Sequence, residues 1–400
     1  MRIPDAVLAR LPRSIGALPS ALKRSALTAA WRRVDVTRLE GVSAANGRRA
    51  TVVIAARFAS ANFILDRLFD GPVRETSLGR CWLGALPKRL AAAEADLTIA
   101  RVAIGVGGWL FDTSYLRLPE LVDSEIVVPA EGERWPRKKS ARSNQRRVAE
   151  NGLTWSTTMD PAEFDRFYTD FYVPFVRGKF GQRSYPVPRT ELRYLFAHGC
   201  LQWVKQGDRT IAGQLLVTDP DCVRCVVLGL VGDGTEANAL GAGAATTLFA
   251  VEYAQQHAIP RVSLGASFAS LCDPLLLSKR YWGFEFKPRR RATHDLLIHW
   301  PTWNPTVEHL LAEIAPIARD GNRLLGLTCD LSAERLDEVA LRQAGRKLGA
   351  DGLAVLGVVG KADDCGAGTR IVDGHLPIVA LRPGSSQAIH DALLCSRRES

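Results

Sequence analysis

Residues 225–286 constrain the fold of this chain more than any other segment. Residues 225–231 form a short apolar run rich in β-branched side chains, which predicts a buried strand. A glycine-containing turn follows, and residues 244–254 then combine helix formers with apolar positions near helical spacing. Residues 261–265 predict the next strand. The order strand, glycine-rich turn, helix, strand indicates one unit of an α/β fold.

Gly241 and Gly243 stand at the start of the predicted helix. Glycines at this place let a phosphate approach the backbone, where unpaired N–H groups and the helix dipole favour negative charge. The turn is therefore a candidate pyrophosphate cradle. A flexible loop without a ligand explains the same glycines, and Gly-x-Gly also begins at Gly105 and Gly366.

The pattern Asn238-x-x-Gly241-x-Gly243 resembles the acyl-CoA motif of GNAT-fold acetyltransferases, which usually begins with Gln or Arg. Residues 264–285 resemble the end of the FemAB-like branch of that superfamily, including CelD-like acetyltransferases linked to polysaccharide production. That branch often has Asp-Gly before a Lys-containing Trp-Gly segment, whereas Pro274 follows Asp273 here.

A basic segment upstream, residues 142–153, resembles the helix that opens the acyltransferase domain in the same branch. The resemblance covers about residues 138–291. It implies a GNAT-type mixed sheet in an α/β fold, with two GNAT-like halves of which only the second binds the donor.

The resemblance also implies an acyltransferase that uses acetyl-CoA or another acyl-CoA as co-substrate, without a metal. The acceptor is then an amine or hydroxyl, for instance on a sugar or polysaccharide precursor. The residues expected to bind the donor are Leu228, Leu230, Asn238, Gly241, Ala242, Gly243 and Ala244.

Three residues are candidates for the chemistry. Asp273 is the candidate base or anchor of the acceptor amine, Lys279 an anion contact, and Tyr281 an acid for the leaving thiolate. A turn before Pro274 equally explains Asp273, and packing explains Trp282. The residues expected to contact the substrate are Arg142, Arg146, Ser267 and, in an expected loop over residues 177–181, Arg177.

Residues 134–147 hold a basic run without an acidic residue, and Arg142 and Arg146 share a helical face. Such a run is either a solvated face or a site for an anionic donor or acceptor. Two other functions therefore stay open. One is a FemAB-type aminoacyltransferase that uses aminoacyl-tRNA. The other is an inactive GNAT scaffold that acts as a binding protein in polysaccharide synthesis.

With 400 residues, the chain has room for two or three domains. The predicted division is a basic arm (1–33), an N-terminal α/β half (34–130), an acyltransferase domain (131–300) and a C-terminal α/β appendix (301–400). In the appendix, strands are expected at 324–328, 353–358 and 378–381. Helices are expected there at 333–348 and 387–395. No function follows from that pattern.

The formal net charge is +10, and residues 1–34 carry seven basic residues against Asp5. This arm is expected to be a solvated extension, with peripheral contact to anionic lipid as the alternative. Because basic residues interrupt its start, no secretory segment is expected and a cytoplasmic location is the default. Nucleic acid is expected as a partner only if tRNA is the donor.

Eight cysteines and seven histidines show no metal-binding spacing. Cys222 and Cys225 have CxxC spacing inside an expected strand, without a second pair at zinc-finger distance. Buried, reduced thiols are therefore expected.

Overall fold

The computed structural model describes residues 32–55, 59–130, 133, 135–136, 139–180, 186–289, 292–330, 336–360 and 369–395. The basic arm expected over residues 1–33 lies outside these, except for its last two residues. The chain divides into two compact units. Unit 1 comprises residues 1–122, 268–276 and 287–400, and unit 2 comprises residues 123–267 and 277–286. The expected boundaries at 130/131 and 300/301 differ from this division, because the chain crosses between the units four times.

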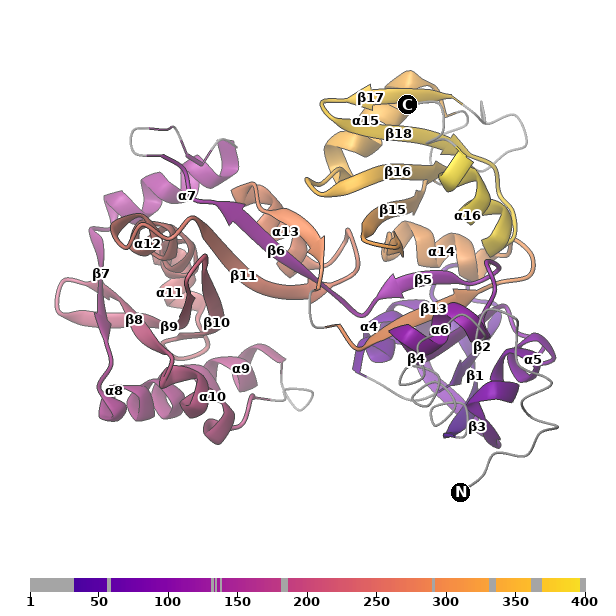
Figure 1. Ribbon diagram of the computed structural model, residues 1–400, viewed down its shortest axis with the longest axis horizontal. Helices are drawn as coiled ribbons and strands as arrows, with labels where there is room; N and C mark the ends of the chain where they lie inside the picture. Colours follow the sequence, from indigo (N-terminus) through magenta and orange to yellow (C-terminus); the bar gives the residue numbers. More distant parts are fainter. Residues whose placement is uncertain are drawn as a thin grey trace. The chain divides into compact units, whose positions relative to one another are not determined.

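Unit 1 contains two mixed sheets (Figure 1). The first has the strand order β3 (Phe69–Trp82), β1 (Arg33–Ser43), β2 (Arg49–Ala55), β4 (Leu97–Ala103), β13 (His294–His299) and β5 (Leu116–Pro119). Its helices are α4 (Ala59–Leu68), η1 (Leu83–Ala85), α5 (Leu86–Ala91) and α6 (Ile104–Leu110). The N-terminal half, expected to be α/β, contains both strands and helices. β13 joins this sheet after a long excursion of the chain through unit 2.

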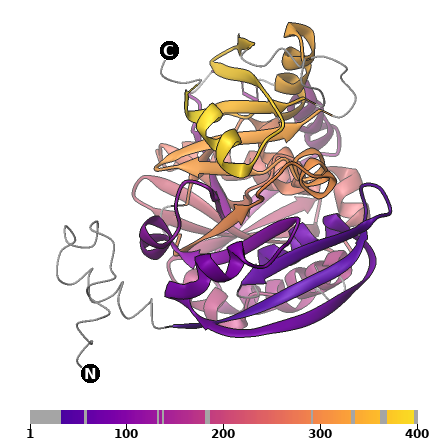
Figure 2. The same ribbon diagram turned by 90° about the vertical axis from the view of Figure 1, so that its right-hand side faces the viewer.

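The C-terminal sheet has the order β14 (Ile317–Asp320), β15 (Arg323–Cys329), β16 (Leu353–Val359), β18 (Leu376–Leu381) and β17 (Arg370–Asp373). Its helices are α14 (Pro305–Glu313), α15 (Glu338–Leu348) and α16 (Ser386–Cys395), and Figure 2 shows the sheet in the same unit as the first. The two sheets share one apolar core, in which Trp300, Leu325 and Leu393 are almost fully buried. The appendix is therefore part of unit 1.

Unit 2 is built on one sheet with the order β12 (Glu285–Pro288), β6 (Leu121–Val127), β11 (Arg261–Phe268), β10 (Cys222–Leu230), β9 (Arg209–Asp219), β8 (Gly199–Gln206) and β7 (Leu153–Thr158). Neighbouring strands from β7 to β10 are antiparallel, whereas β10 and β11 are parallel. A mixed sheet is what the GNAT resemblance implied for this part of the chain, and the three sheets confirm the α/β class.

The helices of unit 2 begin before β7 and continue to the end of the unit. They are α7 (Lys139–Glu150), α8 (Pro161–Arg166), the π-helix η2 (Phe167–Tyr172), α9 (Val173–Phe180), α10 (Arg189–Phe196), α11 (Thr235–Leu240), α12 (Ala242–Gln256) and α13 (Pro274–Trp282). Asp160 caps α8, because its carboxylate accepts the Ala162 N–H at 2.9 Å. The loop expected over residues 177–181 is wrong where it is described, since α9 continues through Phe180.

The connection between β10 and β11 decides the architecture of unit 2. Parallel neighbours need a crossover, and α11 and α12 supply it. Ala245, Phe249 and Ala250 of α12 are buried among the apolar side chains of the sheet. A helix with so many buried positions lies at the centre of a core rather than on its surface.

Candidate functional site

The two parallel strands of unit 2 pair over only a small part of their length. Val223 pairs with Val262 and Arg224 pairs with Ser263, although β10 continues to Leu230 and β11 to Phe268. Beyond Ser263 the strands therefore part. A gap between parallel strands leaves backbone groups without ladder partners, and such groups need hydrogen bonds from side chains, water or a ligand.

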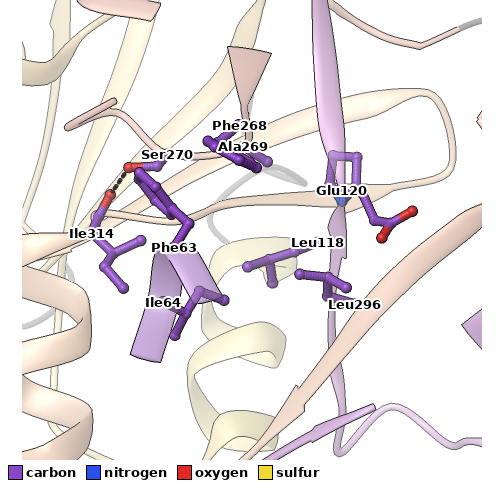
Figure 3. A pocket seen from close by; sticks show the side chains of 10 residues that line it. Phe63, Ile64, Leu118, Glu120, Phe268, Ala269, Ser270, Leu296 and Ile314 are labelled. Carbon is purple, nitrogen blue, oxygen red and sulfur yellow. Dashed lines mark hydrogen bonds between the residues drawn. The ribbon is translucent and has the colours of Figure 1, made fainter. Parts of the chain in front are cut away.

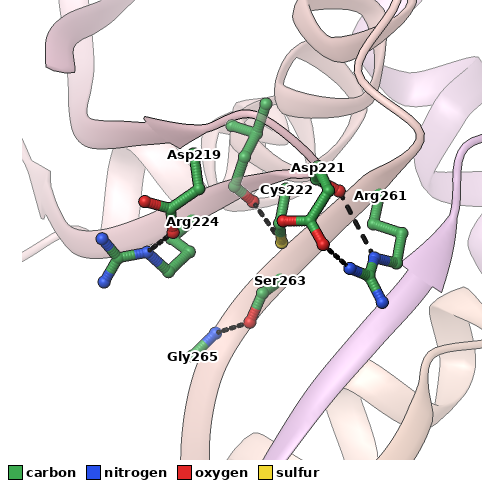
Figure 4. A network of polar contacts seen from close by, with 8 residues as sticks. Asp219, Asp221, Cys222, Arg224, Arg261, Ser263 and Gly265 are labelled. Carbon is green, nitrogen blue, oxygen red and sulfur yellow. Dashed lines mark hydrogen bonds and ion pairs between the residues drawn. The ribbon is translucent and has the colours of Figure 1, made fainter.

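Two ion pairs lie beside the paired end of the gap, one between β10 and β9 and one between β11 and the turn before β10 (Figure 4). Arg224 Nε lies 2.7 Å from Asp219 Oδ2, and Arg261 pairs with Asp221. The strands separate at Gly265, whose φ of +70° is disfavoured for residues with a side chain. Ser263 Oγ accepts the Gly265 N–H at 3.3 Å. The bend in β11 is thus fixed at one glycine, two residues after the last pair.

Two backbone N–H groups of β10 point to the edge of this strand that faces away from β9. Val231 donates its N–H to Ile211 of β9 at 3.0 Å. Because N–H direction alternates along a strand, Leu228 and Leu230 direct their N–H groups to the opposite edge, toward β11. A bulge between Cys225 and Val227 precedes them. The GNAT resemblance implied that Leu228 and Leu230 bind the acyl donor, and the register directs the N–H groups of both residues to this edge.

The helix starts beyond the gap differ from the expected turn. Asn238 is an exposed residue of α11, a helix that the sequence did not predict. Gly241 (φ +95°) ends α11 and caps α12. A methyl group added at Gly243 would lie 2.8 Å from Asn238 Oδ1, so the Asn238 side chain lies directly against Gly243. Gly243 and Ala244 are half-buried in the first turn of α12, where N–H groups have no partners within the helix.

One residue of the basic run on α7 lies beside this turn. Ala141 and Val148 are buried and define the packed face. At 100° per residue, Arg142 and Arg146 lie on one flank of that face and Arg147 on the other. A methyl group at Gly241 would lie 3.5 Å from the side-chain carbons of Arg147. The structure therefore places Arg147, rather than Arg142 or Arg146, beside the glycine turn.

Asn151 fixes this arrangement at the end of α7. Its side-chain amide donates to Arg147 O at 2.9 Å and to Leu240 O at 3.2 Å. The second bond satisfies a carbonyl at the end of α11. Spacing within the basic run showed only that Arg142 and Arg146 share a face. Which flank meets the turn depends on this tertiary contact.

Lys279 is a buried cation at the bend of β11. It is 7% exposed, and its Nζ donates to Gly265 O at 2.8 Å and to Ala266 O at 3.1 Å. Burial raises the pKa of the Cys225 thiol to about 12, and the charge of Lys279 opposes this rise. The ammonium predicted to contact an anion is thus bound to two backbone carbonyls of the gap.

The other chemical candidates have different surroundings. Asp273, in unit 1, is 4% exposed and accepts the N–H groups of Phe268 at 3.1 Å and Leu275 at 3.2 Å. Such bonds are typical of a capping residue before a helix, which favours the turn interpretation. Tyr281 is 45% exposed on α13. The Trp282 ring stacks on Trp135 with 5.5 Å between centroids, which agrees with packing.

Two expected substrate contacts lie elsewhere in unit 2. Ser267 on β11 is 2% exposed, and its hydroxyl has no hydrogen-bond partner among the described residues. Arg177 is exposed near the end of α9. A methyl group on the next residue, Gly178, would lie 3.5 Å from Asp233. That contact brings α9 to the turn after β10, so Arg177 lies on a helix beside the strand end.

Unit 1 holds a small pocket of a different kind (Figure 3). Its walls are mostly apolar, and Phe63 stacks on Phe268 with 4.5 Å between ring centroids. Its two polar side chains are engaged: Arg101 binds Glu120 through two hydrogen bonds of 2.7 and 3.1 Å, and Ser270 donates to Ile314 O. The described residues that line this pocket therefore offer no row of backbone N–H donors like that of β10.

Within the described ranges, no group of three or more His, Cys, Asp or Glu residues is arranged to hold a metal ion. Cys222 and Cys225 are buried free thiols, as expected. No helix in the part of the chain that the structure describes is long and apolar enough to cross a bilayer.

No protein-family model and no curated protein matches this chain. Similar solved structures include L-PGS from Bacillus licheniformis, with 9% identity and a TM-score of 0.35 over 65% of this chain and 83% of that one. FemX has 11% identity and a TM-score of 0.33, over 74% of this chain and 96% of FemX. A tandem GNAT protein from the clavulanic acid biosynthesis pathway has 13% identity and a TM-score of 0.29, over 63% and 79% of the two chains. With TM-scores below 0.5, none of these likenesses identifies the function of this chain.

Proposed function

We propose that this protein is a GNAT-type acyltransferase that moves an acyl group, with acetyl as the first candidate, from acyl-CoA to an amine or hydroxyl. The observation that carries the proposal is the gap between β10 and β11, where the register directs the Leu228 and Leu230 N–H groups away from β9. A row of donors suits a ligand rich in carbonyl and amide oxygens. The pantetheine arm and the thioester of acyl-CoA have that chemistry.

The residues around the gap divide the binding of such a donor between them. The first N–H groups of α12, at Ala242, Gly243 and Ala244, suit a pyrophosphate, because the helix dipole favours an anion there. Arg147 lies beside the same turn and adds a positive charge. Bound acyl-CoA supplies the activated acyl group.

The chain's own contribution to the transfer is polarisation and positioning. An N–H of Leu228 or Leu230 directed at the acyl carbonyl would stabilise developing negative charge, an effect of about 3 kcal/mol for a single oxyanion donor. Tyr281 is the candidate acid for the thiolate. The acceptor gives up one proton as its bond to the acyl carbon forms and the C–S bond breaks. Asp273 is a candidate base, although its two backbone hydrogen bonds favour a capping role.

The acceptor is proposed to be a sugar or polysaccharide precursor, which rests on the sequence resemblance to CelD-like proteins alone. A cytoplasmic location is proposed separately, from the sequence alone. Contact of residues 1–34 with anionic lipid is likewise a proposal, and residues 1–31 of this arm lie outside the described residues.

Calorimetric titration with CoA tests the donor assignment. Gly243→Val should lower CoA affinity at least about tenfold, or 1.4 kcal/mol, because the side chain closes the approach to the first turn of α12. Asn238 is exposed and can move aside, so circular dichroism should stay near wild type. Gly105→Val is the matched control, since that helical glycine in α6 has nothing within 4 Å of an added Cβ. Unchanged CoA affinity in Gly243→Val would remove the cradle assignment.

A tRNA donor is the second candidate, and the basic flank of α7 formed by Arg142 and Arg146 favours it. Changing both to Gln should leave CoA affinity intact if CoA is the donor, because they lie on the flank opposite Arg147. If tRNA is the donor, its affinity should instead fall, with the salt slope reduced by about 0.7 to 0.9 for each lost phosphate contact. We expect the first result. Binding of neither donor would favour an inactive scaffold.

A further inference from the structure

Lys279 is a buried lysine that binds the backbone of β11. Its ammonium donates to two backbone carbonyls of that strand. These carbonyls belong to Gly265 and Ala266, directly after the bend. Ser124 of β6 adds a second donor to the Gly265 carbonyl at 3.1 Å. Two side chains thus bind the backbone of β11 where it leaves β10.

The register identifies what these carbonyls would do if the strands stayed together. Continuing the pairing of Val223 with Val262 sets Leu228 opposite Ser267. In a parallel ladder, an N–H bonds to the carbonyl of the residue before its opposite partner, which here is Ala266. The bulge in β10 shifts this count by one residue and then offers Gly265 instead. Lys279 binds both.

We infer that Lys279 is a positioning residue that keeps the gap open. It binds the two carbonyls with which the Leu228 N–H could pair, so this N–H stays free for a ligand. The two edges of the gap become unequal: acceptors on β11 are satisfied by the protein, whereas donors on β10 face the opening. This inference rests on the proposed donor site, because the free donors matter only if a ligand uses them.

Hydrogen exchange of the Leu228 and Leu230 amides, read by NMR on the full chain without ligand, tests the inference. Lys279→Met keeps the length of the side chain and removes its donors. The strands should then pair further, and protection of the Leu228 amide should rise about tenfold or more. General destabilisation lowers protection. The direction of the change in protection at Leu228 therefore distinguishes closure of the gap from partial unfolding.

Lys205→Met is the matched control, since Lys205 is a half-buried lysine of β8 in the same sheet. It should leave both amides unchanged. Lys279→Arg retains a cationic donor and should also leave protection low. Ser124→Ala removes the other donor and should raise protection at Leu228 by a smaller factor.

Unchanged or lower protection at Leu228 in a folded Lys279→Met variant would overturn the inference. If that variant does not fold, Ser124→Ala decides, and no rise at Leu228 overturns it. The measurement needs no CoA. Failure of CoA to bind would therefore remove the proposed function and leave the exchange result standing.

Discussion

The first sheet of unit 1 and the sheet of unit 2 each contain a parallel strand pair away from their edges, and the two pairs differ in how far they extend. In unit 1, β2 pairs with β4 from Val52 through Ala55, the last residue of β2. In unit 2, β10 pairs with β11 at two residues and then continues to Leu230 without pairing to β11. The strands of the pair in unit 1 thus stay paired to the end of β2. In unit 2 we attribute the separation of β10 and β11 to the residues around the bend of β11.

The difference lies in the second strand of each pair. β4 contains no glycine, and its other edge is covered by β13. β11 contains Gly265 in a left-handed conformation, with Lys279 and Ser124 bound to the carbonyl of that residue. The comparison therefore supports the proposal that unit 2 binds the donor.

The largest effect is expected from Gly265→Val. A β-branched residue at φ +70° is strained by about 1–3 kcal/mol, and the new Cβ would lie 3.4 Å from Cys225 O. We expect loss of CoA affinity and a matching drop in the free energy of unfolding, measured by calorimetry and denaturant titration. Gly207→Val is the control, because Gly207 has φ +56° in a hairpin with nothing within 4 Å. It should lose stability and keep CoA affinity. Equal CoA affinities in the two variants would mean that the bend at Gly265 has no particular role in donor binding.

Asp273→Ala should have an intermediate effect. The Phe268 N–H at the end of β11 and the Leu275 N–H in the first turn of α13 lose their acceptor, so the free energy of unfolding should fall by about 1–2 kcal/mol. Denaturant unfolding measures the loss, and Asp273→Asn should recover part of it, since Asn also caps helices. Wild-type stability in Asp273→Ala with turnover reduced more than tenfold would restore Asp273 as the base.

The smallest effect is expected from Ala100→Gly, which places a glycine at the last paired residue of β4. The free energy of unfolding should fall by about 0.5–1 kcal/mol through backbone entropy. The ladder between β2 and β4 should stay closed, because no buried lysine holds a bend there. Hydrogen exchange of the β2 amides reads this directly. Faster exchange confined to these amides would mean that a glycine alone opens a parallel pair.

Local sequence was sufficient for most elements near the site. The apolar run before residue 231 predicted β10, and the small and apolar residues after Gly243 predicted α12. Prediction from local sequence failed where one glycine both ends a helix and starts the next. Gly241 ends one helix and starts another, so α11 was taken for a loop. Arg177 was placed in a loop because Gly178 is a poor helix former, and tertiary contact of α9 with the turn at Asp233 overrides that preference.

The sequence by itself determined the α/β class and the order of strands around the glycine turn. These follow from hydrophobic periodicity and local backbone preference, which neighbouring residues carry. The tertiary structure alone decided that Arg147 rather than Arg142 or Arg146 meets the turn. It also decided that Lys279 binds the carbonyls of β11, and that β10 and β11 part after Ser263. Each of these depends on which faces of separate elements meet when the core packs, and no local pattern encodes that choice.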